Sequence, residues 1–213
     1  MLLFDLYDII ENGENGTIEF KRKFSSPEKI AKEMIAFANT KGGKIIFGID
    51  DDKSVVGVES EKGEMELIDS AAKFYCEPEI KYNYEIIHIY RKDVIIVDIP
   101  ESKTKPHCLI EDDKPDRTKV YIRLKDKSVL ASKETIKILK RSNPDSPPMI
   151  FMLGDKEKYL VNYLTYHEKI TVGELKELLN LSNRRASRML VNLTQAEILI
   201  HNLTDYEDFY TLK

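Results

Sequence analysis

Residues 37–52 read FANTKGGKIIFGIDDD, and this stretch decides the fold of the first part of the chain. Gly42 and Gly43 end a helical pattern, and the apolar run after them predicts a buried strand at residues 44–49. A Walker phosphate loop would place its lysine and a serine or threonine at the start of a helix. Here Lys44 leads into a strand, so the sequence excludes that loop and indicates a helix–turn–strand unit.

Helix and strand patterns are mixed on both sides of this stretch. A helix is expected at residues 26–40, because Ser26 can cap it and Pro27 suits its first position. The other elements expected in this part are helices at 5–11 and 67–74 and strands at 17–24, 55–58, 79–90, 93–99 and 120–124. Helices mixed with adjacent strand hairpins place the fold in the α+β class.

A proline-rich segment predicts the domain boundary. Residues 142–148 read SNPDSPP, and three prolines in seven residues neither continue a helix nor fit a sheet interior. We therefore expect a first domain at 1–141, a linker at 142–148 and a second domain at 149–213.

The second domain has the pattern of a winged helix-turn-helix. Three helices followed by two strands are the order of that fold, and they are expected at 155–166, 172–179, 183–196, 198–203 and 209–212. The third helix carries Arg184, Arg185 and Arg188, and we expect these side chains to contact duplex DNA in the major groove. The alternative is that they form a solvated helix face in a protein-binding domain.

The hairpin that would form the wing is acidic, with Asp205, Glu207 and Asp208. A wing that follows a phosphate backbone should be basic, because backbone affinity comes from neutralised phosphates. We expect either that this wing stays away from DNA or that the domain docks on protein.

Composition limits the class of protein. The chain has 213 residues, is 42% hydrophobic and carries a net charge of −4, so nucleic-acid binding would need a local basic patch. Its two cysteines, Cys76 and Cys108, are too few for a disulfide scaffold. No apolar run is long enough for a membrane span, and the N-terminus lacks signal-peptide features. We expect a cytoplasmic protein with no membrane partner.

Four segments together resemble a known family. They are similar to the Schlafen-type AlbA DNA-binding domain, once labelled a divergent AAA domain, over roughly residues 8–135. The segments are Glu14 with Glu19-Phe20-Lys21, AFANTKGGKIIFGIDDDKSVVGV at 36–58, KPH at 105–107 and YIRLKDKSVLAS at 121–132. In prokaryotes this domain often precedes a winged helix, in chains described as transcriptional regulators.

The resemblance implies a DNA-binding transcriptional regulator. Its AlbA-like domain would bind nucleic acid or mediate dimerisation, and a homodimer is expected because half-site recognition usually uses two recognition helices. The resemblance also places Lys21, Arg123 and Lys125 on the nucleic-acid side of the first domain. Taken singly, each of these is as readily an ordinary surface cation.

Two other functions stay open. Some Schlafen proteins cut structured RNA with three carboxylates and a divalent metal, which implies a site of Glu14, Glu19 and Asp50 holding Mg²⁺ or Mn²⁺. The other is an interaction module without nucleic-acid affinity. We expect a protein that is not an enzyme and needs no cofactor.

Overall fold

The structure is a computed structural model, and it describes residues 3–110, 119–144, 146, 152–204 and 206–213. The chain divides into two compact units, Met1–Ala131 and Ser132–Lys213. This division lies before the predicted linker at 142–148, part of which falls outside the described residues. Helix α4 (Lys133–Arg141) groups with the second unit because its side chains bond to α7 (Asn183–Gln195).

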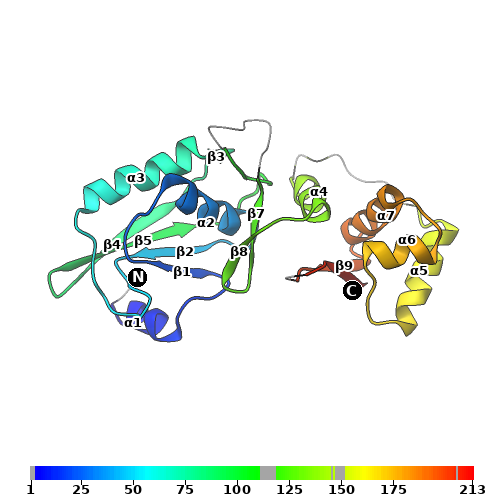
Figure 1. Cartoon of the computed structure of the whole chain (residues 1–213), viewed down its shortest axis with the longest axis horizontal. Helices are drawn as coiled ribbons and strands as arrows, with labels where there is room; N and C mark the ends of the chain where they lie inside the picture. Colours follow the sequence, from blue (N-terminus) through cyan, green and yellow to red (C-terminus); the bar gives the residue numbers. More distant parts are fainter. Residues whose placement is uncertain (1–2, 111–118, 145, 147–151, 205) are drawn as a thin grey trace. The chain divides into compact units, whose positions relative to one another are not determined.

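The first unit is built on a four-stranded sheet in the order β1-β2-β5-β4. Its strands are β1 (Ile18–Lys21), β2 (Gly43–Phe47), β4 (Asn83–Ile89) and β5 (Lys92–Ile99). The β1–β2 pair is parallel, and the other two pairs are antiparallel. A parallel pair needs a crossover connection, and helix α2 (Pro27–Asn39) supplies it, with Ser26 as its N-cap (Figure 1).

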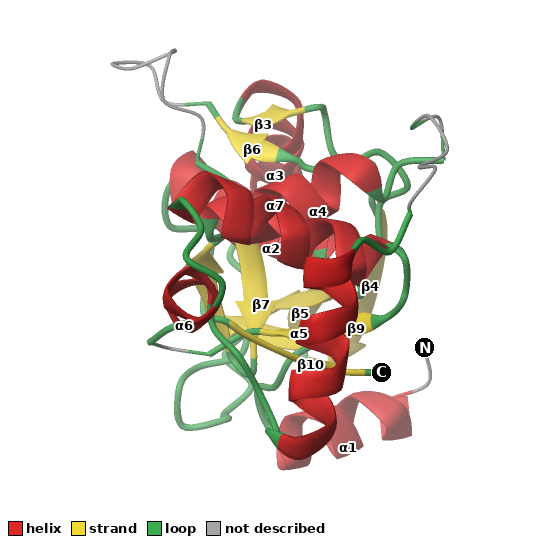
Figure 2. Ribbon diagram, turned by 90° about the vertical axis from the view of Figure 1, so that its right-hand side faces the viewer, coloured by secondary structure: helices red, strands yellow, loops and turns green. Residues whose placement is uncertain are grey.

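Strand alternation divides the core of this unit between the two faces of the sheet. On β2, Ile45 and Phe47 pack against α2 and α3 (Glu61–Phe74), whereas Ile46 packs against α1 (Leu3–Asn12). Figures 1 and 2 show α2 and α3 on one side of the sheet and α1 on the other. The α+β class is confirmed, as a three-layer unit in which both sheet faces are covered.

Two short antiparallel strand pairs and one irregular segment complete this unit. Strand β3 (Cys76–Glu77) pairs with β6 (Cys108–Leu109), and β7 (Tyr121–Leu124) pairs with β8 (Lys127–Leu130). The strand expected at 55–58 is wrong: this segment forms only isolated bridges, from Val55 to Ile49 and from Val58 to Asp93. Helix α3 begins at Glu61 instead of residue 67, because Ser60 caps it by accepting a hydrogen bond from Gly63 N at 3.2 Å.

The second unit contains three further helices and a terminal hairpin. These are α5 (Asp155–Tyr166), α6 (Val172–Leu178), α7, β9 (Leu199–Asn202) and β10 (Phe209–Leu212). Thr171 and Glu174 form a capping box at the start of α6. The core side chains come from every one of these elements, and they include Leu160, Leu164, Leu175, Leu190, Leu193, Leu199 and Tyr210.

No helix in the described parts of the chain combines the length and the apolar character that a bilayer span requires.

Gly42 in the turn between α2 and β2 should not tolerate a side chain. Its φ is +73°, and an added Cβ would lie 2.7 Å from the Ile99 carbonyl oxygen and 2.8 Å from the Glu101 nitrogen. We expect Gly42→Ala to lower the free energy of unfolding by at least about 1–3 kcal/mol, measured by urea denaturation. Gly173→Ala is the control, because its Cβ would meet nothing closer than 3.8 Å. Equal unfolding midpoints for the two variants would contradict the expectation.

Candidate functional site

Helix α7 presents an arginine-rich face to solvent. Ser182 caps the helix by accepting a hydrogen bond from Arg185 N at 3.4 Å, and no acidic residue lies in the first turn. Arg184, Arg185 and Arg188 are exposed. The opposite face is buried and consists of Ala186, Ser187, Met189, Leu190, Val191 and Leu193. Packing thus fixes the helix and leaves the three guanidinium groups on its free side.

The positive charge of this face is not neutralised within the described part of the chain. None of the three arginine side chains forms an ion pair with a described residue. The N-terminal turn of a helix already carries a partial positive charge, and anions are stabilised there. A guanidinium group can bind a phosphate or the edge of a guanine through two parallel hydrogen bonds. The geometry therefore suits a polyanionic ligand.

The hairpin after α7 is less acidic at its surface than its sequence suggests. Asp208 Oδ2 accepts a hydrogen bond from Ser132 Oγ at 2.5 Å and lies 3.1 Å from His201 Nε2, so its carboxylate is directed inward. Burial alone would raise the pKa of Asp208, but the contacts with His201 and Ser132 outweigh it and lower the pKa. Glu207 is exposed, and Asp205 lies outside the described residues.

The three carboxylates expected to hold a divalent metal do not converge. Glu14 Oε1 accepts a hydrogen bond from Phe20 N at 2.8 Å, and Asp50 Oδ2 pairs with Arg22 at 2.6 Å. Glu19 is buried and accepts hydrogen bonds from Lys21 and Arg123. Within the described residues, these three do not form a set of ligand atoms within 4.8 Å of one another. Each carboxylate instead has a structural partner in the protein itself.

Arg123 lies in the interior, not on a nucleic-acid face. Its side chain is 2% exposed, and its Nη1 donates to Glu19 Oε2 and Glu33 Oε2, each at 3.0 Å. The same nitrogen lies 3.1 Å from Ser128 Oγ, and the guanidinium stacks on the Phe37 ring at 4.6 Å. The expected phosphate contact is therefore corrected: two carboxylates hold this guanidinium, which joins β1, α2 and β7.

The other two cations expected on this face differ in exposure. Lys21 is half-buried and bonds to Glu19. Lys125 is exposed in the turn between β7 and β8, where its φ is +55°. Of the three cations predicted for the first unit, Lys125 alone offers an unobstructed charge to solvent.

Sequence reasoning missed Glu33 and Asn39, which organise this interior. Glu33 lies on the same helical stripe as Ile30 and Phe37, and a charge on an apolar stripe is the signal that could have found it. Asn39 is 2% exposed, and its amide nitrogen donates to the carbonyl oxygens of His107 and Tyr121, each at 2.9 Å. The asparagine thereby connects the end of α2 to β7 and to the residue that precedes β6.

His107 is a structural histidine with both ring nitrogens engaged. Its Nδ1 lies 2.7 Å from the Pro78 carbonyl oxygen, and its Nε2 lies 2.7 Å from Ser102 Oγ. A carbonyl can only accept, so the neutral ring carries its proton on Nδ1 and accepts the serine hydroxyl at Nε2. The ring also borders a cavity of about 370 Å³. Burial lowers the pKa of His107, and the charge of Lys105 adds to this effect.

The lowered pKa of His107 predicts a loss of stability in acid. An unfolded histidine titrates near pH 6.5, so below this value the unfolded chain binds more protons than the folded one. The stabilisation is complete above about pH 6.5 and is lost as the pH falls toward the lower folded pKa. We expect the urea midpoint to fall between pH 7.5 and pH 5, and to fall less in His107→Gln. An equal pH dependence in both proteins would contradict this assignment.

The family of the chain follows from comparison with known proteins. A family model described as Schlafen, AlbA_2 matches residues 14–132, which is more than half of the 213 residues. The chain therefore belongs to the Schlafen AlbA_2 family. The match ends at the border between the two structural units, so it covers most of the first unit, from residue 14, and almost none of the second.

Two solved structures have limited similarity to the chain. One is the DIP2311 protein from Corynebacterium diphtheriae, with 15% identity, a TM-score of 0.48, and coverage of 78% of this chain and 37% of that chain. The other is the N-terminal domain of a protein from Nitrosomonas europaea described as related to the ATP-dependent DNA helicase RecG. It has 20% identity, a TM-score of 0.43, and coverage of 61% of this chain and 94% of that domain. The chain thus spans 37% of the length of DIP2311.

Proposed function

We propose that this protein is a DNA-binding transcriptional regulator whose second unit is a winged helix-turn-helix that reads duplex DNA. The observation that carries the proposal is the exposed face of α7, where Arg184, Arg185 and Arg188 lie without a described acidic partner. The order of α5, α6, α7 and the β9–β10 hairpin is the order of a winged helix. In such domains the second helix of the helix-turn-helix, here α7, enters the major groove.

The first unit would assist in one of two ways. It would bind nucleic acid directly, as the association of its family with nucleic acid supports, or it would hold two copies together. A homodimer would present two α7 helices to two half-sites. In the first unit, Lys125 is the exposed member of the predicted cations. Arg123 is not part of the proposed interface, because its guanidinium is buried.

Binding of this kind uses side-chain contacts and needs no cofactor. A metal-dependent nuclease at Glu14, Glu19 and Asp50 is not proposed, because the carboxylates do not converge and Glu19 is bonded to Arg123.

Fluorescence anisotropy would test the proposal. The full chain would be titrated into a labelled duplex from upstream of its own gene, with a random duplex and a structured RNA as competitors. We expect preferential binding of the upstream duplex, with an affinity that falls steeply as salt rises. No binding to any duplex would overturn the proposal and favour a protein-interaction module, and preference for the RNA would overturn the choice of ligand.

A further inference from the structure

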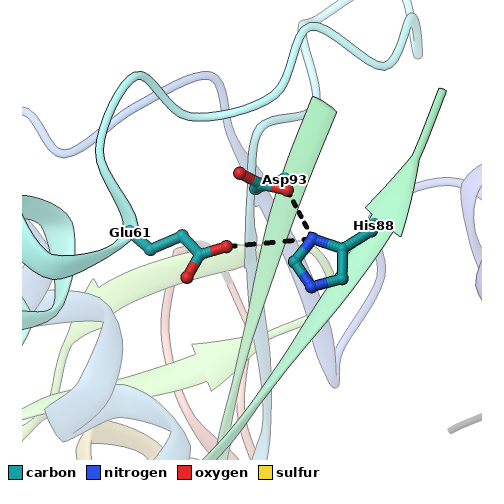
Figure 3. Close-up of side chains that lie close together, drawn as sticks. All are labelled: Glu61, His88 and Asp93. Carbon is teal, nitrogen blue, oxygen red and sulfur yellow. Dashed lines mark hydrogen bonds and ion pairs between the residues drawn. The ribbon is translucent and has the colours of Figure 1, made fainter. Parts of the chain in front are cut away.

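The first unit contains a second group of side chains that can ligate a metal, and it includes none of the site residues predicted from the sequence. Glu61, His88 and Asp93 each offer one ligand atom, and these atoms lie within 4.8 Å of one another. His88 Nδ1 lies 2.6 Å from Asp93 Oδ1 and 3.8 Å from Glu61 Oε1. Figure 3 shows both carboxylates directed toward the same ring nitrogen. In the described residues this is the one such convergence of three ligand-type side chains.

The backbone holds these three residues in place from separate parts of the chain. His88 on β4 and Asp93 on β5 are direct cross-strand partners. Glu61 is the first residue of α3, and the segment before it is fixed to β5 because Val58 N donates to the Asp93 carbonyl oxygen at 2.8 Å. Lys92 Nζ adds a bond to the Val55 carbonyl oxygen at 2.6 Å. The β4–β5 hairpin thus brings His88 and Asp93 together, and the packing of the segment before α3 places Glu61 beside them.

The cluster has more negative charge than its single imidazole can balance. Neither Glu61 nor Asp93 forms an ion pair with a lysine or arginine among the described residues; His88 is the partner of both. Lys62, next to Glu61, pairs with Glu66 instead. The N-terminal end of α3 favours an acid at Glu61 but does not account for Asp93. A bound cation would satisfy both carboxylates at once.

We propose that Glu61, His88 and Asp93 form a binding site for a divalent transition-metal ion of the zinc class. An imidazole with two carboxylates and no thiolate suits Zn²⁺, Co²⁺ or Mn²⁺, whereas Mg²⁺ and Ca²⁺ prefer oxygen ligands alone. The side chain of His88 is 72% exposed, which leaves room for water in the remaining coordination positions.

The distances require only a small adjustment. Two ligands of a tetrahedral zinc ion lie about 3.3 Å apart when each bond is about 2.0 Å. The separation from His88 to Glu61 is already 3.8 Å, and Asp93 would move outward from 2.6 Å as the ion replaces the shared proton. The ion would then connect the β4–β5 hairpin to the start of α3, and it would stabilise the folded state in proportion to its affinity and concentration.

Isothermal titration calorimetry of the full chain with ZnCl₂ would test this site. The titration is best done at pH 8, because the hydrogen bond that His88 donates to Asp93 raises the pKa of His88, and protons compete with the metal. We expect one Zn²⁺ per chain, a higher thermal midpoint with Zn²⁺, and affinity at least about tenfold weaker in His88→Gln and in Asp93→Asn. His167→Gln is the matched control, because it removes an exposed histidine in the second unit.

Two outcomes would overturn the site. One is unchanged zinc affinity in both His88→Gln and Asp93→Asn with folding intact, as judged by circular dichroism. The other is a thiolate charge-transfer band in the Co²⁺ spectrum, which would assign the ion to Cys108 or Cys76. DNA binding by the α7 variants is measured separately, so a failure of this site and a failure of the proposed regulator function are distinguishable.

Discussion

Replacing Arg123 with methionine should lower the free energy of unfolding by about 3–5 kcal/mol. The substitution keeps most of the side-chain volume but removes the guanidinium that Glu19 and Glu33 share, each at 3.0 Å. Both carboxylates would stay in an interior with little water, and burying an uncompensated charge is costly. In the variant Lys21 still contacts Glu19, and the Ser128 hydroxyl still donates to Glu33. These two contacts keep the expected loss of stability within this range.

Urea denaturation would measure this loss, with Lys127→Met as the control on the same hairpin. Lys127 is exposed, so its substitution should change stability by no more than about 0.5 kcal/mol. Adding Glu19→Gln and Glu33→Gln to Arg123→Met should recover part of the loss, because the buried charges then disappear together. If Arg123→Met alone lowers the free energy of unfolding by less than about 1 kcal/mol, the ion pairs of Arg123 with Glu19 and Glu33 do not stabilise the fold as expected.

Removal of two arginines from α7 should weaken duplex binding by about 10- to 100-fold at fixed salt. The variant Arg184→Ala/Arg188→Ala loses two exposed guanidinium groups and leaves the buried face of the helix unchanged. If both groups contact phosphates, the slope of log affinity against log salt should fall by about 1.8. If one of the two arginines contacts a base instead, the main loss should be in the preference for the upstream duplex over the random one, and the salt slope should fall less.

The charge-matched control for this experiment is Lys62→Ala/Lys158→Ala. These lysines are exposed and lie outside α7, so the variant changes net charge equally without altering the proposed contact. Similar losses in the two double variants would mean that affinity follows total charge, and α7 would then not be the recognition helix. Fluorescence anisotropy at several salt concentrations would separate these results.

Local signals in the sequence were sufficient for most elements of the fold. Ser26 and Pro27 located the start of α2, and the glycines at 42–43 located its end. The start of α3 was missed because its first turn is polar and only the cap at Ser60 marks it. The parallel pairing of β1 with β2 and the order of the sheet depend on packing between distant segments. The repeat of 2.0 residues in strands and of 3.6 residues in helices shows which face of an element is buried, but it does not show which strands pair.

The candidate sites also fall into two groups: those that local sequence patterns predict and those that only the folded chain reveals. The arginines of α7 follow from helical periodicity, because their opposite face is apolar, and the structure places them on the exposed side. Arg123 is expected on the nucleic-acid side because the family resemblance places the last strand and its loop there, but the structure buries its side chain. Its partners Glu19 and Glu33 are 104 and 90 residues away, so only the folded chain reveals the pairing. His88 and Asp93 are five residues apart and pair across the β4–β5 hairpin, whereas the position of Glu61 beside them depends on tertiary structure.

The long separation in sequence between Arg123 and the two acids that it binds, Glu19 and Glu33, also has a consequence for synthesis on the ribosome. Glu19 and Glu33 leave the exit tunnel first, and the side chain that neutralises them is made 104 and 90 residues later. Until then Glu19 has only Lys21 as a cationic partner, and packing α2 over Glu33 would bury a carboxylate without its guanidinium, so we expect this layer to close late. We therefore expect the interior of this unit to become fully packed only after the β7–β8 hairpin has been synthesised.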